Sequence, residues 1–131
     1  MMEMLAAEVQ KKQDVKFRSF FSTMVAEIQT LPDENLDRLL TQLSPEVSWG
    51  DRQNAAKKIG NLRSLNAVPG LLTALELDPF WMVRCTIIQA LEKIGDPSAI
   101  PALMDTAGRD GFQIVRAYAA KAVERLQPAT G

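Results

Sequence analysis

Apolar residues recur along most of this chain at alternating intervals of three and four positions, a spacing that places side chains on one face of a helix. The first such stripe consists of Phe17, Phe21, Met24, Ile28 and Leu31. A second stripe follows Pro32-Asp33-Glu34, residues that suit a helix start, and consists of Leu36, Leu39, Leu40 and Leu43. The pattern predicts a helical hairpin over residues 17–47 that caps the rest of the fold. Residues 1–16 have weak periodicity, so we interpret them as an extension, either a frayed helix or a segment that orders on a partner.

From Ser48 onward the pattern becomes a repeat. Four residues return 32 positions later, namely Asp78, Phe80, Val83 and Arg84 as Asp110, Phe112, Val115 and Arg116. The pairs Val68-Pro69 and Ile100-Pro101 have the same separation. A fixed period in this range, built from pairs of helices, indicates an α-solenoid. The repeats are expected to fill residues 48–126, and residues 127–131 form a tail.

The first repeat is expected to differ from the second in its turn. Ser48 resembles an N-cap, with Asp51 in the acidic position of a capping box. The helix behind it is predicted to end at Gly60, a natural left-handed C-cap position, and Gly60 lies 35 positions before Gly95. The first inter-helix turn is therefore expected to be three residues longer than the second. By this offset, Trp49 stands where the second repeat has Arg84.

The first helix of the second repeat is apolar on two faces, as expected of a helix buried between neighbours. One face carries Val83, Ile87, Ala90, Leu91 and Ile94, and the other carries Trp81, Cys85 and Ile88. The third repeat is half present, and its predicted core residues are Val115, Ala119, Ala122, Val123 and Leu126.

Composition narrows the functions that are open to the chain. Its 131 residues fit one domain, and 15 Lys and Arg against 16 Asp and Glu give a net charge of −1, which argues against nucleic-acid binding but allows a local basic patch. Histidine is absent and Cys85 is the only cysteine. One chain therefore cannot build a disulfide, a Cys/His zinc site or a His-based catalytic triad. Neither a secretory signal nor a membrane span is recognisable, so we expect a cytoplasmic protein without metal or cofactor.

The second repeat resembles the HEAT-like repeat of the phycobilin-lyase type. The matching elements are Asp78, Val83-Arg84, Ala90-Leu91, Ile94-Gly95-Asp96-Pro97 and Ile100-Pro101-Ala102-Leu103. The resemblance implies an all-α fold, a short right-handed solenoid of about seven helices. Repeats of this family serve in bilin attachment, in phycobilisome breakdown and in general adaptors, which suggests a cyanobacterial or plastid setting. The family's lyase subunits are longer than this chain and often work as pairs of chains.

Several residues are candidates for partner binding, the aromatic ones because such residues are enriched at interface centres and the arginines as part of an acidic and basic row. These are Trp81, Phe80, Arg84, Arg116 and Trp49. Trp81 and Cys85 do not recur 32 positions later and are therefore interpreted as particular to the second repeat. Asp78 and Asp110 are interpreted as a structural ladder in which each Asp caps a helix start and each Arg reaches the adjoining repeat. An acidic and basic row that binds a partner is the alternative. Cys85 is interpreted as an inert buried thiol, with a bilin or cluster ligand as the alternative.

These observations favour a non-catalytic adaptor or chaperone-like module that binds another protein, with the first helices of the pairs or their loops as the binding face. The resemblance extends this expectation to a phycobiliprotein or a photosynthetic assembly component as the partner. The alternatives are a subunit of a bilin lyase or isomerase and, disfavoured by charge, a nucleic-acid-binding HEAT protein. The sequence leaves the oligomeric state open.

Overall fold

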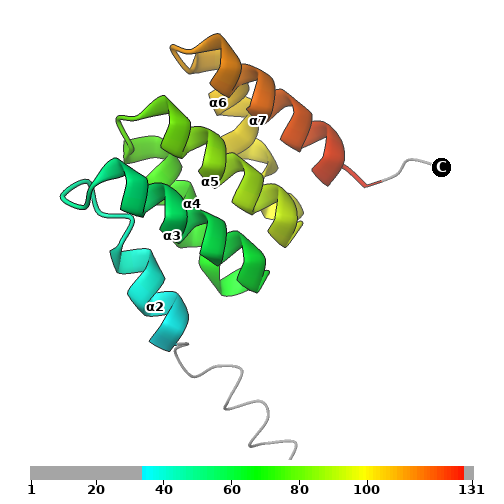
Figure 1. Ribbon diagram of the computed structural model, residues 1–131. Coiled ribbons are helices and arrows are strands. Elements are labelled where there is room, and N and C mark those ends of the chain that lie inside the picture. The colour runs from blue at the N-terminus through cyan, green and yellow to red at the C-terminus, as the bar shows by residue number, and fades with distance from the viewer. Residues whose placement is uncertain (1–33, 129–131) are drawn as a thin grey trace, which may run out of the picture. The chain divides into compact units, whose positions relative to one another are not determined.

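The computed structural model describes residues 34–128, and this part of the chain is built from α-helices and short 3₁₀ helices without a strand (Figure 1). The helices are α2 (Glu34–Thr41), α3 (Trp49–Leu62), η1 (Leu65–Ala67), α4 (Val68–Leu77), α5 (Trp81–Ile94), η2 (Pro97–Ala99), α6 (Ile100–Arg109) and α7 (Gln113–Leu126). The prediction of a short all-α solenoid is confirmed. The expected extension, the helix from Phe17 to Leu31 and the last three residues lie outside the described residues.

The helices form two layers that follow the repeat (Figure 1). One layer contains α3, α5 and α7 side by side, and α5 packs against both of its neighbours. The other layer contains α4 and α6, with α4 packed on α5 and α6 on α7. Helix α2 packs on α3. Each described pair therefore consists of a 14-residue first helix and a 10-residue second helix.

The core lies between these helices, and α5 is buried on two faces as predicted. Ile87 and Ile88, on different faces of α5, are both 0% exposed. In the last helix, the predicted residues Val115, Ala119 and Ala122 are also 0% exposed. Burial of a large aliphatic side chain contributes about 1.5–3 kcal/mol, so each of these two isoleucines stabilises the stack. No helix in the described range is long and apolar enough to cross a membrane.

The prediction of a longer first turn is wrong, and so is the predicted helix end at Gly60. Helix α3 continues to Leu62 and is capped by Arg63 in the left-handed region, with φ of 53°. Its counterpart is Gly95, with φ of 78°, 32 positions later. Ser64 and Asp96 then cap η1 and η2 in the same way, each accepting the backbone N–H two residues on. The 32-residue period thus holds through both turns.

Gly60 has a packing role instead. A Cβ atom at this position would lie 2.9 Å from the Cα atom of Ala90, closer than real Cβ contacts come. The missing side chain therefore allows α3 to approach α5 closely, a use of glycine that is distinct from a helix end. The predicted N-cap is confirmed, because the Ser48 hydroxyl accepts the backbone N–H of Asp51 at 3.4 Å.

Candidate protein-binding site

Ion pairs join the first helices α3 and α5 to the turn that begins the next repeat, and the first of these pairs is buried while the second is partly buried. In the first pair, Arg52 of α3 donates from Nε to Oδ2 of Asp78 at 2.8 Å and from a terminal nitrogen to Oδ1 at 3.3 Å. Both residues are 5% exposed. The third guanidinium nitrogen donates to the backbone carbonyls of Pro45 and Val47. A buried arginine in this geometry has each of its nitrogens bonded, as burial of a charge requires.

The second pair repeats the first one step along the stack. Arg84 of α5 donates to Oδ2 of Asp110 at 2.7 Å and to Oδ1 at 3.0 Å, and it also donates to the backbone carbonyl of Asp78 at 3.0 Å. Partial burial by itself would raise the pKa of Asp110, but hydrogen bonds from Arg84 and from the backbone N–H of Phe112 outweigh it and hold the pKa below its usual value. Arg116 begins a third step by donating to the backbone carbonyl of Asp110. We call these Arg and Asp residues the ladder.

A row of four stacked aromatic rings runs beside the ladder, across the starts of α3, α5 and α7. We call Trp49, Phe80, Trp81 and Phe112 the aromatic row. Successive ring centroids lie 4.9, 6.3 and 6.0 Å apart, with interplanar angles between 21° and 27°. Trp49 is 46% exposed and Phe112 is 48% exposed. Phe80 and Trp81, between them, are partly buried against the core.

The ladder fixes the position of this row. Oδ1 of Asp78 accepts the backbone N–H of Phe80 at 2.9 Å, and Oδ1 of Asp110 accepts that of Phe112 at 3.0 Å. Each carboxylate therefore binds an arginine of one repeat and the aromatic residue of the next. In addition, the guanidinium of Arg84 lies over the Phe112 ring, with Cζ 5.7 Å from the centroid, a favourable cation–π distance. Two of the four rings, Phe80 and Phe112, are thus positioned by the same residues that join the repeats.

Comparison with known families agrees with this geometry. A family model described as HEAT repeats matches residues 36–124, most of the chain. The chain belongs to the HEAT-repeat family. The match is to HEAT repeats in general and does not single out the phycobilin-lyase type. A comparison with curated proteins finds none that matches. HEAT repeats generally mediate protein–protein interaction, which makes an exposed and ordered row of aromatic rings the natural place to look for a binding surface.

The structure brings most of the predicted partner-binding residues of this HEAT protein together and corrects the alignment of its first repeat. Arg52, rather than Trp49, takes the place of Arg84, because both arginines bind the Asp that lies 26 residues further on. Trp49 instead lies 32 positions before Trp81 and stacks in the same row, so the interpretation that Trp81 does not recur is wrong. The sequence reasoning did not name Arg52 or Phe112 as site residues. The 32-residue period relates Phe112 to Phe80 directly, and it relates Arg52 to Arg84 when the shift at Gly60 is left out.

The aspartates act slightly differently from the prediction. Asp78 and Asp110 accept N–H groups of the turn before each helix, whereas α5 and α7 begin without a side-chain cap. Each of these aspartates also ends the preceding helix, since the N–H of Asp78 donates to Ala74 and that of Asp110 to Thr106. The same residue therefore ends one helix, shapes the turn and binds the ladder arginine.

Cys85 lies within α5 of the repeat stack and is 7% exposed. Burial raises the pKa of its thiol, and the nearby Asp110 carboxylate raises it further, against a smaller opposing effect of Arg84. A thiol with a raised pKa is a poor nucleophile and a poor ligand at neutral pH. Within residues 34–128, no three His, Cys, Asp or Glu side chains lie close enough together to hold a metal ion.

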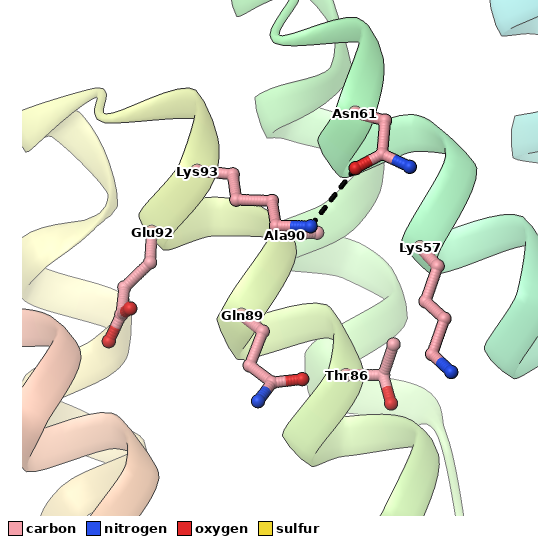
Figure 2. A pocket seen from close by; sticks show the side chains of 7 residues that line it. All are labelled: Lys57, Asn61, Thr86, Gln89, Ala90, Glu92 and Lys93. Atoms are coloured by element: carbon pink, nitrogen blue, oxygen red, sulfur yellow. Dashed lines mark hydrogen bonds between the residues drawn. The ribbon is translucent and has the colours of Figure 1, made fainter.

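A second surface feature of the HEAT stack is a polar groove between α3 and α5 (Figure 2). Its volume is about 310 Å³. Lys57 and Asn61 line it from α3, and Gln89, Glu92 and Lys93 line it from α5. The ammonium group of Lys93 reaches across the groove and donates to Oδ1 of Asn61 at 3.0 Å. We call this feature the basic groove.

Proposed function

We propose that this chain is a non-catalytic adaptor that binds another protein at the aromatic row. The observation that carries the proposal is the stack of Trp49, Phe80, Trp81 and Phe112, with its two outer rings about half exposed. Large aromatic side chains dominate the energy of protein interfaces when they are buried at the centre of the contact. The outer rings therefore offer apolar area that a partner can cover.

Order in the free protein supports this role. Binding costs conformational entropy whenever a mobile side chain is fixed, by about 0.5–1.5 kcal/mol for each flexible group. Here the ring of Phe112 is held by Trp81 on one side and lies next to the guanidinium of Arg84, and its backbone is held by Asp110. Little entropy remains to be lost at this position when a partner binds.

The class of partner is suggested by the sequence. The elements from Asp78 to Leu103 resemble the phycobilin-lyase type of HEAT-like repeat, and this resemblance supports a phycobiliprotein or another component of photosynthetic assembly as the protein that is bound. The chain acts in this proposal by holding its partner, without chemistry of its own. The buried Cys85 thiol, with its raised pKa, gives no support to a covalent step at this residue.

The experiment compares binding of the full chain with binding of variants that shorten the row at its exposed ends. Immobilised wild-type chain is expected to retain a purified apo-phycobiliprotein, and Trp49→Ala or Phe112→Ala is expected to weaken retention at least tenfold, since hot-spot truncations cost about 2 kcal/mol or more. Met104→Ala is the matched control, because Met104 is 58% exposed on α6, outside the row. Circular dichroism of each variant checks that the helices are intact.

Two results would count against the proposal. Unchanged binding by both aromatic variants would show that the row is not the contact, and an equal loss for Met104→Ala would show a general effect. Co-expression with an apo-phycobiliprotein and free bilin tests the enzymatic alternative. Increased covalent attachment of the chromophore would assign the chain to a lyase subunit in place of an adaptor.

A further inference from the structure

The basic groove is a separate surface from the aromatic row, and its side chains differ in chemistry. We propose that it binds an acidic segment of a partner protein, with an Asp or Glu carboxylate placed between the ammonium groups of Lys57 and Lys93. The two lysines come from different helices, α3 and α5, and both line the same groove. This inference is independent of the aromatic row and holds for any partner that carries the acidic segment.

The position of Lys93 is the first argument. Its hydrogen bond to Asn61 draws the ammonium group across the groove toward α3 (Figure 2). An ammonium group has three N–H donors, so two remain after this bond. Its alkyl stem lies over the close approach of Gly60 and Ala90, since a Cβ atom on Gly60 would contact Cδ of Lys93 at 3.6 Å. The charge is thus held in place in the free protein and keeps donors for a ligand.

Lys57 is the second argument. It is exposed, and no hydrogen bond or ion pair joins its side chain to another residue of the range 34–128. Figure 2 shows its ammonium group on the α3 side of the groove, with the Gln89 amide on the opposite side. A carboxylate that enters the groove can therefore accept from Lys57, from Lys93 and from the Gln89 amide.

The acidic residue of the groove is directed elsewhere. Glu92 lines the groove but binds Arg125 of α7, with Oε2 3.0 Å from a terminal guanidinium nitrogen. Figure 2 shows the Glu92 side chain pointing away from Lys57 and Asn61. Its ion-pair partner in the described range is therefore Arg125, and neither Lys57 nor Lys93 forms an ion pair with it.

Charge is also distributed unequally between the two layers of helices. All four lysines of the described range, Lys57, Lys58, Lys93 and Lys121, lie in α3, α5 or α7. Helices α2, α4 and α6 have no lysine, and their two basic residues, Arg38 and Arg109, are outnumbered by Glu34, Asp37, Glu76 and Asp105. Complementary charge steers a partner and fixes its register, so an acidic segment is directed toward the layer that contains the groove.

An acidic protein segment fits this surface better than a nucleic acid does. A nucleic acid carries a phosphate at every nucleotide, and its binding proteins usually have a clear excess of basic residues. Here Glu92 and Glu124 lie on the same helices as the lysines, and the whole chain has a net charge of −1. A peptide with spaced carboxylates can avoid these acidic side chains.

The test uses the isotope-labelled full chain and a dodecapeptide of alternating Glu and Ala. Backbone amide shifts are followed during titration, and the affinity is taken from them. The amides of Lys57, Asn61, Gln89 and Lys93 are expected to shift most. Lys57→Gln and Lys93→Gln are each expected to weaken binding about two- to fivefold. Lys58→Gln is the matched control, because Lys58 makes the same charge change one residue away but lines a different groove, between α2 and α3.

Controls define what would overturn the proposal. A peptide of alternating Gln and Ala should not bind, and Trp49→Ala should bind the acidic peptide as well as the wild type does. The proposal is wrong if the Glu peptide causes no shifts at millimolar concentration, if its shifts lie away from the groove, or if Lys58→Gln weakens binding as much as Lys57→Gln. Tighter binding of a twelve-nucleotide oligothymidine would assign the groove to nucleic acid instead.

Discussion

Asp78→Ala tests whether the ladder holds the repeats together. The substitution removes the carboxylate that binds Arg52 and also accepts the N–H of Phe80. Arg52 is 5% exposed, so its charge stays buried after the carboxylate is gone. Breaking a buried pair by removing one partner costs about 3–5 kcal/mol, because the remaining charge is left uncompensated.

The structure places this variant toward the lower end of that range. The carbonyls of Pro45 and Val47 still accept from one nitrogen of Arg52, while two other donors lose their partner. We therefore expect a loss of about 3 kcal/mol, a large share of the roughly 5–15 kcal/mol that stabilises a domain. Arg125→Ala is the comparison, since in its pair with Glu92 the substituted side chain is exposed, with Arg125 at 60% and Glu92 at 17%. Exposed pairs contribute about 0–1 kcal/mol.

Urea denaturation, followed by circular dichroism, measures the free energy of unfolding of each variant. A double variant separates charge burial from shape, because Arg52→Met in the Asp78→Ala background removes the buried charge. We expect the double variant to be more stable than Asp78→Ala alone. A loss below about 1 kcal/mol for Asp78→Ala, similar to that of Arg125→Ala, would refute the argument that the ladder stabilises the stack.

Three further predictions follow from the same structure. Gly60→Ala should destabilise the protein by about 1–3 kcal/mol in urea denaturation, because its Cβ would lie 2.9 Å from Ala90 Cα, whereas Gly108→Ala, with nothing within 4 Å, should stabilise it by about 0.5 kcal/mol. Arg63→Gly should raise the melting temperature, because Arg63 has φ of 53° and a non-glycine residue there costs about 1 kcal/mol; an unchanged or lower value would contradict this. The folded state lowers the pKa of Asp110. The contribution of this carboxylate to the free energy of unfolding is therefore present above the unfolded pKa of about 3.9 and is lost as pH falls through the folded pKa. The stability difference between wild type and Asp110→Asn should shrink from pH 5 to pH 2.

The fold could be predicted because its buried positions recur at a fixed interval along the sequence. Buried positions such as Val83 and Val115 recur at 32 residues and lie at equivalent places in α5 and α7. The turns were harder because different residues perform the same task. Arg63 and Gly95 both adopt a left-handed conformation, yet only glycine signals it in a sequence. Gly60 led to a wrong prediction of the helix end, because a glycine required for close packing cannot be distinguished in the sequence from one required for a turn.

The candidate site was predictable in its residue types and less so in its geometry. Trp49, Phe80 and Trp81 are recognisable as interface-prone residues, but the stacking of Trp49 on Phe80 and of Trp81 on Phe112 depends on how far one repeat is displaced from the next. The repeat period alone does not give that displacement, which is set by contacts such as Gly60 against Ala90. The basic groove could not be predicted for the same reason, since its lining residues come together only when α3 and α5 lie side by side.

Scaffold and binding surface are therefore coupled through single residues. Asp110 binds Arg84 and positions the backbone of Phe112, and Arg84 lies over the ring that Asp110 has positioned. A ladder variant that leaves the protein folded should consequently loosen the aromatic row and weaken partner binding without removing any ring. A variant such as Trp49→Ala should weaken partner binding by removing a ring while leaving the ladder intact, because Trp49 is half exposed and takes no part in the ladder. In a HEAT stack of this kind, the residues that appear purely structural in the sequence also determine where the binding side chains lie.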